Sequence, residues 1–357
     1  MLTLREMGAA PLTTAVLNAR KREVLEAIIT CYNRTAKPVS SRTIARQCDM
    51  RLSPATIRNT MAQLGEYGYL AQPHTSAGRI PTELGYRVYV DNMMTTQRLT
   101  DEECRFIRQW YDSSELDIFE TVEQTSKILS QISHYIGVAL SPQLHDGILR
   151  RLELIPLDTQ RVVVVLIANS GLVKNQVISI RESVSKADIK RISRILNEKL
   201  AGLSLGEIQR ISQSHKNLKA VFDQDLSDSV ATLARNTFSL DREIHVYLNG
   251  TSNFFGQPEF LEVEQIEPLF RFLEQKERVA DLLSPKKESP DIQVLIGSEN
   301  RCEGMEMCSV VQSTFSVQGD LLGTIGVIGP TRMEYSRVVS IVKFTAHVIG
   351  QHLQKAV

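Results

Sequence analysis

Hydrophobic residues near the N-terminus recur at the three- and four-residue spacing of a helix in three successive segments, each opening on a polar capping residue. The first segment begins after Asn18 and stops before Pro38. The second begins after Ser40 and the third after Ser53, where Pro54 takes the first helical position, at which a missing N–H costs nothing. Two short helices around a tight polar break are typical of a helix-turn-helix.

The third segment has one hydrophobic face and one polar face. Ile57, Met61 and Leu64 follow one another at intervals of four and three residues, which predicts that they are buried together. The other positions carry small or hydrogen-bonding side chains suited to base edges and phosphates, namely Ala55, Thr56, Arg58, Asn59 and Gln63. Gly65 lowers helix stability by about 1 kcal/mol relative to alanine, so we expect the helix to bend or end there.

A short hairpin is predicted after this helix. Residues 68–72 and 80–82 have the character of strands and flank the polar loop 73–79. Thr82 then provides a cap for a further helix that contains residues 85–91. A hairpin that follows a helix-turn-helix in this way is a wing, so the N-terminal unit is predicted to be a winged helix.

Strand patterns dominate the rest of the chain after two helices between residues 101 and 136. They cover residues 152–154, 161–168, 172–180, 292–296, 309–317 and 322–328, and a helix at 336–353 closes the series. The interval 184–283 is mostly helical by its spacing, with one alternating strand at 244–248. Strands split around such an interval predict one domain, over 99–183 and 284–357, into which a second domain is inserted.

The overall composition is ordinary, whereas the distribution of charge distinguishes the N-terminal unit from the rest of the chain. With 42% hydrophobic and 23% charged residues, the chain is typical of globular proteins. Its longest apolar run, 162–168, is far shorter than the roughly 20 residues of a membrane span, so we expect a cytoplasmic protein without a membrane partner. Residues 1–90 contain twelve Lys or Arg against six Asp or Glu, a net charge of +6, and the other 267 residues carry −6. A basic unit on an acidic body is typical of a protein that binds DNA through that unit.

No catalytic or metal-binding pattern stands out in the sequence. The five cysteines form no CxxC pair, and the seven histidines form neither an HxxxH nor an HExxH pattern. Gly323, Gly326 and Gly329 have neither the spacing of a dinucleotide-binding motif nor that of a phosphate-binding loop. We therefore expect no enzymatic activity, no cofactor and no metal.

Three motifs of the N-terminal unit, in this order, resemble HrcA, a family of bacterial heat-inducible transcription repressors. They are residues 53–59 (SPATIRN), 74–82 (HTSAGRIPT) and 85–91 (GYRVYVD). The resemblance continues at residues 250–253, 308–311 and 323–335, so it covers nearly the whole chain and leaves residues 1–17 as an extension. Thr60, Gln63 and Gly65 depart from it, because acidic residues are expected there.

The resemblance implies an α+β multidomain protein. Its expected parts are an N-terminal winged helix-turn-helix at 1–98, a GAF-like domain over 99–183 and 284–357, and an inserted α/β dimerisation domain at 184–283. It also implies a homodimeric repressor that binds the CIRCE inverted repeat in double-stranded DNA, upstream of chaperone operons of the groE and dnaK type. The chaperonin GroE is expected to maintain its active state.

In such a repressor the DNA contacts are expected to come from the helix-turn-helix and the wing. We expect Thr56, Arg58 and Asn59 in the major groove, Gln63 within reach of a base or phosphate, and Arg42, Ser53 and Arg79 near phosphates. In the wing, His74 with Thr75 and Ser76 is expected near the DNA backbone, and a solvated loop histidine is the alternative. A second class of function stays open, in which the GAF-like domain binds a small-molecule effector and the winged helix is its output.

Overall fold

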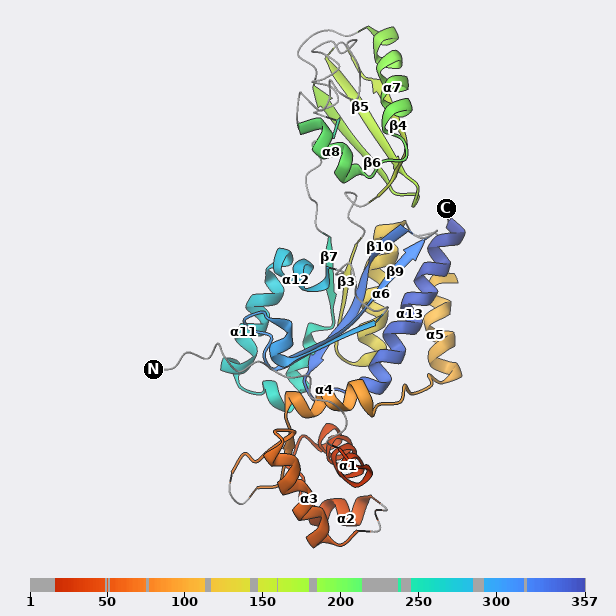
Figure 1. Cartoon of the computed structure of the whole chain (residues 1–357). Helices are drawn as coiled ribbons and strands as arrows, with labels where there is room; N and C mark the ends of the chain where they lie inside the picture. Colours follow the sequence, from red (N-terminus) through yellow and green to blue (C-terminus); the bar gives the residue numbers. More distant parts are fainter. Residues whose placement is uncertain are drawn as a thin grey trace.

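The structure is a computed structural model, and it describes residues 17–48, 50, 52–74, 77–112, 117–141, 147–158, 160–179, 185–213, 237–238, 245–284, 292–317 and 320–356. Three parts follow one another in Figure 1: a small helical unit, a central sheet covered by helices, and a lobe with a sheet of its own.

The small helical unit, called the head below, is a winged helix. Its elements are α1 (Ala19–Thr35), α2 (Ser41–Gln47), α3 (Pro54–Glu66), β1 (Leu70–Ala71), β2 (Ile80–Pro81) and α4 (Glu83–Asn92). The predicted caps are confirmed: the side chains of Asn18, Ser40, Ser53 and Thr82 each accept a hydrogen bond from a backbone N–H in the first turn of the helix that follows. The helix through Gly65 ends one residue later, at Glu66.

A central sheet of five antiparallel strands forms the body of the molecule. In spatial order its strands are β7 (Val246–Asn249), β3 (Ile136–Leu140), β10 (Asp320–Pro330), β9 (Cys308–Val317) and β8 (Ile292–Ile296). Alternate residues of each strand serve opposite faces, as in β3, where Ile136 and Val138 point into one hydrophobic cluster and Ala139 points into the other.

Helices cover both faces of this sheet (Figure 1). On one face lie α5 (Asp101–Asp112), α6 (Ile118–Ser133) and α13 (Tyr335–Ala356). On the other lie α11 (Val263–Glu274) and α12 (Lys276–Leu283), preceded by the short 3-10 helices η4 (Thr251–Gly256) and η5 (Pro258–Phe260). A third 3-10 helix, η6 (Gly297–Asn300), follows β8.

A separate sheet of three strands forms the lobe. Its elements are β4 (Leu149–Pro156), β5 (Arg161–Ala168), β6 (Val173–Ser179), α7 (Lys186–Leu200) and α8 (Leu205–Gln213). Val162, Val164 and Leu166 of β5 are buried against Ile189 and Leu196 of α7 in a hydrophobic cluster that belongs to the lobe alone. The lobe stands away from the central sheet in Figure 1.

The grouping of strands therefore differs from the one expected at the boundaries 183/184 and 283/284. Strands β4 to β6, expected in the split domain, form the lobe, and β7 with the helices up to residue 283, expected in the insert, pairs and packs with the central sheet. The reason is that alternation tells which side chains of a strand are buried but not which strand lies next to it. The interval between β3 and β7 leaves the central sheet and returns to it.

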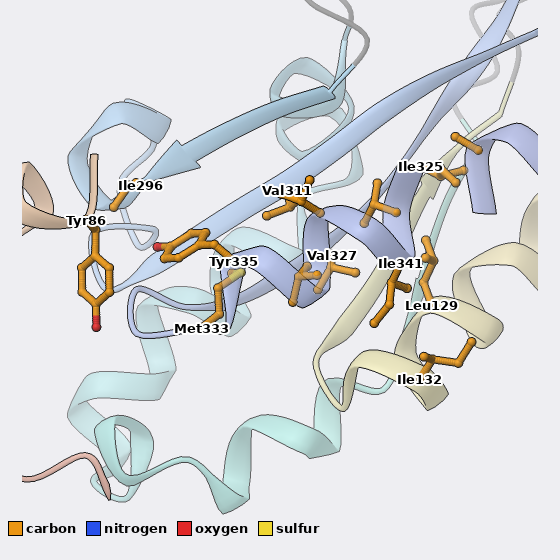
Figure 2. Close-up of a cluster of buried hydrophobic side chains, with 14 of the residues drawn as sticks. Tyr86, Leu129, Ile132, Ile296, Val311, Ile325, Val327, Met333, Tyr335 and Ile341 are labelled. Carbon is orange, nitrogen blue, oxygen red and sulfur yellow. The ribbon is translucent and has the colours of Figure 1, made fainter. Parts of the chain in front are cut away.

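The head shares its hydrophobic core with the body. One cluster of buried side chains runs from Leu25 and Ile57 in the head to Val311 and Ile341 in the body. Figure 2 shows the place where they meet, with Tyr86 of α4 close to Tyr335 at the start of α13. The head is therefore packed onto the body and is not joined to it by a linker alone.

Of the helices that the structure describes, none combines the length and the apolar character needed to cross a membrane. Within the same residues, no group of three or more His, Cys, Asp or Glu side chains is placed to hold a metal ion.

Candidate nucleic-acid interface

The orientation of α3 is fixed by its cap and by its buried face. The hydroxyl of Ser53 accepts a hydrogen bond of 3.1 Å from the backbone N–H of Thr56 and lies 2.9 Å from the Thr56 hydroxyl. Ile57 and Leu64 are fully buried and Met61 nearly so, against α1 and α2. The predicted buried face is confirmed, and the opposite face of α3 is turned to solvent.

That opposite face carries most of the expected base-contacting residues. Arg58, Asn59 and Gln63 are exposed, and Thr56 is half-buried beside the cap. Thr60 behaves differently, because it is buried and its hydroxyl donates a 3.0 Å hydrogen bond to the carbonyl of Thr56. These three polar side chains thus point to solvent from a helix, an element whose width suits the major groove.

Basic side chains flank α3 on the preceding helix. Arg42 lies exposed in the first turn of α2, and Arg46, also exposed, lies one turn later on the same face. Within the residues that the structure describes, neither they nor Arg58 takes part in an ion pair. Arg46 was not among the expected DNA contacts, although its four-residue spacing from Arg42 places it on the same face of the helix.

The wing is short, and its loop is only partly described. The backbone N–H of Ala77 donates a 2.8 Å hydrogen bond to the carbonyl of His74, and the side-chain amide of Gln72 donates to Ala77 at 3.1 Å. His74 is exposed at this turn. Thr75 and Ser76 lie outside the described residues.

Arg79 joins the wing to both ends of the helix-turn-helix. Its backbone exchanges two hydrogen bonds of 2.8 Å with Val39, just before α2. Its side chain is half-buried, and the guanidinium lies against Gly65 in the last turn of α3. Its place beside α3 is thus set by backbone hydrogen bonds and by packing.

The helix behind the wing faces the body instead of the solvent. Glu83 and Arg87 of α4 bind Ser298 and Glu299 across the junction between head and body. Burial lowers the pKa of Arg87, but its hydrogen bonds with Glu299 and Asp91 outweigh that effect and hold the pKa above its usual value. In Figure 1, α4 lies next to the body and α2 and α3 lie at the far end of the head, so the paired charges of α4 lie away from the arginines of α2 and α3.

A hollow in the body, about 350 Å³ in volume, lies between α11 and the loop at residues 303–304. Its charged lining is engaged locally: Arg271 binds Glu267 at 2.6 Å, and Arg278 donates to Gln275 at 3.2 Å and lies over the ring of Phe272. These contacts leave the described lining with few groups free to orient a ligand.

Comparison with known proteins gives matches over nearly the whole chain. A family model described as "Winged helix-turn-helix transcription repressor, HrcA DNA-binding" matches residues 16–95, and one described as "HrcA protein C terminal domain" matches residues 120–339. The "Heat-inducible transcription repressor HrcA" of Pelotomaculum thermopropionicum is 39% identical over 341 residues, which are 96% of this chain and 98% of that protein. The repressor of the same name from Geobacter sulfurreducens is 38% identical over 339 residues, 95% of this chain and 98% of that protein.

One solved structure has a similar fold. It is a crystal structure at 2.2 Å resolution of a protein described as hypothetical, with a TM-score of 0.58 and 23% sequence identity. The similarity covers 97% of this chain and all of the other. It supports the arrangement of the elements and says nothing of a ligand.

Proposed function

The chain belongs to the HrcA family of heat-inducible transcription repressors, and from this we propose that it represses chaperone operons of the groE and dnaK type by binding the CIRCE inverted repeat as a homodimer. The observation that carries the proposal is the exposed face of α3, where Arg58, Asn59 and Gln63 lie beside two exposed arginines of α2 that form no ion pair within the described part of the chain. The proposed function involves neither catalysis nor a bound metal.

The proposal gives the residues on α3 and α2 two kinds of role. Arg58 and Asn59 read base edges in the major groove, where arginine is suited to guanine and asparagine to adenine. Arg42 and Arg46 bind phosphates along the helix before, and Ser53 lies at the N-terminus of α3, where backbone N–H groups favour an anion. These are contacts of two kinds, one that selects sequence and one that supplies affinity.

A homodimer follows from the symmetry of the proposed operator, since an inverted repeat is matched by a two-fold axis. The outer face of the lobe supports a place for its interface. Ile155, Val163 and Val177 lie side by side across β4, β5 and β6, and Val173 lies opposite Ile167. Val177, Val173 and Ile155 are 58%, 55% and 46% exposed, an apolar surface of the kind that marks protein interfaces.

The proposed link to heat stress is a matter of mass action. If only the folded dimer binds the operator, then any process that drains the folded state relieves repression, and a chaperonin that returns misfolded chains to it restores repression. The central sheet, which we propose to be GAF-like, assembles from segments far apart in the chain, and such assembly favours aggregation-prone intermediates. When other unfolded proteins occupy GroE, less GroE is available to the repressor, and the fraction of folded repressor falls.

The DNA-binding proposal is tested with the full chain and three duplexes: the inverted repeat, a single half-site and a scrambled sequence. We expect the repeat to bind tightest, and Arg58→Ala to lose about 1 to 3 kcal/mol on the repeat while changing little on the scrambled duplex. Arg194→Ala serves as the control, because Arg194 is an exposed cation on α7 of the lobe. Equal losses on all three duplexes would mean that Arg58 does not read sequence.

The chaperonin proposal is tested by a heat pulse followed by cooling, with operator binding measured with and without GroE and ATP. Recovery that requires both is the expected result. Full recovery of the protein on its own would overturn the role of GroE and indicate a repressor that senses temperature by reversible unfolding.

A further inference from the structure

The junction between head and body is built from motif residues that have no part in the proposed DNA contacts. Residues 85–91 lie on α4, and residues 331–335 connect β10 to α13. The structure brings these two segments together, as Tyr86, Met333 and Tyr335 show in Figure 2. Asn33, near the end of α1, binds both segments. The motifs therefore serve the contact between the two parts.

Arg332 lies at the centre of this junction and is almost completely buried, with 8% of its surface exposed. Its Nη1 donates a 2.9 Å hydrogen bond to the backbone carbonyl of Asn33 in the head. Its Nη2 donates at 3.0 Å to Oε1 of Gln257, and its Nε pairs with the carboxylate of Glu259. The planar guanidinium thus binds the head on one side and the segment before α11 on the other.

Asn33 is held in return from both sides. Its side-chain amide donates a 3.0 Å hydrogen bond to the carbonyl of Met333, and its Oδ1 accepts one of 2.6 Å from the hydroxyl of Tyr86. The ring of Tyr86 packs on that of Tyr335, with centroids 5.6 Å apart. Both Tyr86 and Met333 are buried, so water competes little for these hydrogen bonds.

Arg87 and Glu83 of α4 form a second anchor between head and body. Arg87 donates to both oxygens of Glu299, at 2.8 and 2.5 Å, and to the carbonyl of Val294 at 2.6 Å. Glu83 accepts from the backbone N–H of Ser298 at 3.2 Å and from its hydroxyl at 2.5 Å. Two separate anchors fix the rotation of the head as well as its position, which one anchor alone would not do.

From this arrangement we propose that Arg332 is a positioning residue for operator binding. It fixes the head on the body, and thereby fixes the distance and rotation between the two α3 helices of a dimer. The proposal rests on the function proposed above, because it concerns how a dimer matches two half-sites. Heads on free tethers would accept half-sites over a wide range of spacing, whereas fixed heads accept only the spacing that suits them.

The choice of variant follows from the contacts of Arg332. Arg332→Ala would leave the carboxylate of Glu259, whose side chain is 15% exposed, without its counter-charge, and would risk unfolding. Arg332→Lys keeps the charge but cannot reach three acceptors at once. Tyr86→Phe removes only the hydrogen bond to Asn33 and keeps the ring. Arg337→Lys is the matched control, because Arg337 binds Glu103 and the carbonyl of Ile132 within the body alone.

The experiment compares the affinity of the full chain for the inverted repeat with its affinity for a repeat whose spacer is longer by about five base pairs, half a helical turn. The wild type is expected to lose up to about 100-fold, since one head then faces away from its half-site. Arg332→Lys is expected to bind the natural repeat about tenfold more weakly and to lose no more than about twofold on the longer spacer, with single half-site affinity unchanged.

Each other outcome has a definite meaning. A wild type that binds the repeat no better than one half-site overturns the proposed dimeric recognition, and this inference with it. If the wild type and Arg332→Lys both lose affinity on the longer spacer, the proposed function stands and the role of Arg332 is wrong. The same conclusion holds if the control Arg337→Lys becomes as tolerant of the longer spacer as Arg332→Lys. If Arg332→Lys does not fold, Tyr86→Phe decides: a relaxed spacer preference supports the proposal, and an unchanged one overturns it.

Discussion

The guanidinium of Arg79 lies against Gly65, so that a β-carbon at Gly65 would stand 3.5 Å from its Nη1. This contact joins the wing to the last turn of the recognition helix. It keeps a positive charge at the end of α3 opposite to the one capped by Ser53. In the proposed complex the two ends of α3 would meet phosphates in different ways, one through backbone N–H groups and one through a side chain of the wing.

The first prediction concerns this arginine. Because Arg79 is placed to meet a phosphate, Arg79→Ala should weaken binding to the operator and to scrambled DNA by the same factor and should lower the dependence of log affinity on log salt concentration by about one unit. A salt series of gel shifts on both duplexes measures this. A loss confined to the operator would instead assign sequence reading to Arg79.

The second prediction compares two glycines of the head. A β-carbon at Gly65 would make only ordinary contacts, so Gly65→Ala should stabilise the protein by up to about 1 kcal/mol through helix propensity. A β-carbon at Gly85 would lie 2.3 Å from the carbonyl oxygen of Tyr69, so Gly85→Ala should destabilise it. Urea unfolding of the full chain checks both changes. Equal shifts for the two variants would contradict the close packing of α4 on the backbone of Tyr69, just before β1.

The third prediction concerns the lobe. Val177→Lys places a charge beside Val163 and Ile155 on the outer face of the lobe, so it should convert the proposed homodimer into a monomer at micromolar concentration, as measured by light scattering. Ala187→Lys adds the same charge on α7, which packs on the other face of this sheet, and should leave the dimer intact. A Val177→Lys protein that remains dimeric would show that the interface lies elsewhere.

The fourth prediction concerns pH. Burial lowers the pKa of His352, which packs on Tyr111; Asp112 opposes the shift and Lys355 adds to it. The unfolded chain, with a pKa near 6.5, therefore binds a proton at a higher pH than the folded chain does. Stability should fall as the pH drops below about 6.5 towards the folded pKa, and His352→Gln should remove this part of the slope. Urea midpoints across that range test it, with His347→Gln, on the exposed side of the same helix, as the control.

The sequence predicted the local features of the head well, because their causes are local. The caps at Ser53 and Thr82 and the buried face of α3 depend on residues within one or two turns, and all three are confirmed. The end of the helix near Gly65 follows from propensity in the same way.

The features that were not predicted depend on partners far away in the chain. Alternation and apolar runs indicated that β4 to β6 and β7 are strands, but their membership of two different sheets is decided by pairing that leaves no mark on a single strand. The junction escaped for the same reason, since Asn33 and Arg332 are 299 residues apart. The motifs at either end were visible, and only the fold shows that they meet.

The order of the strands also has a consequence for synthesis on the ribosome. In the central sheet β3 pairs with β7 and β10, both of which follow the lobe in the chain, so β3 waits unpaired while the lobe is translated. The head emerges first, yet Arg332 and Tyr335, which hold it, emerge after every strand of that sheet. A nascent chain therefore contains α3 long before the residues that fix the orientation of the head have been synthesised. Premature termination within the body would yield a head that is not fixed to the body.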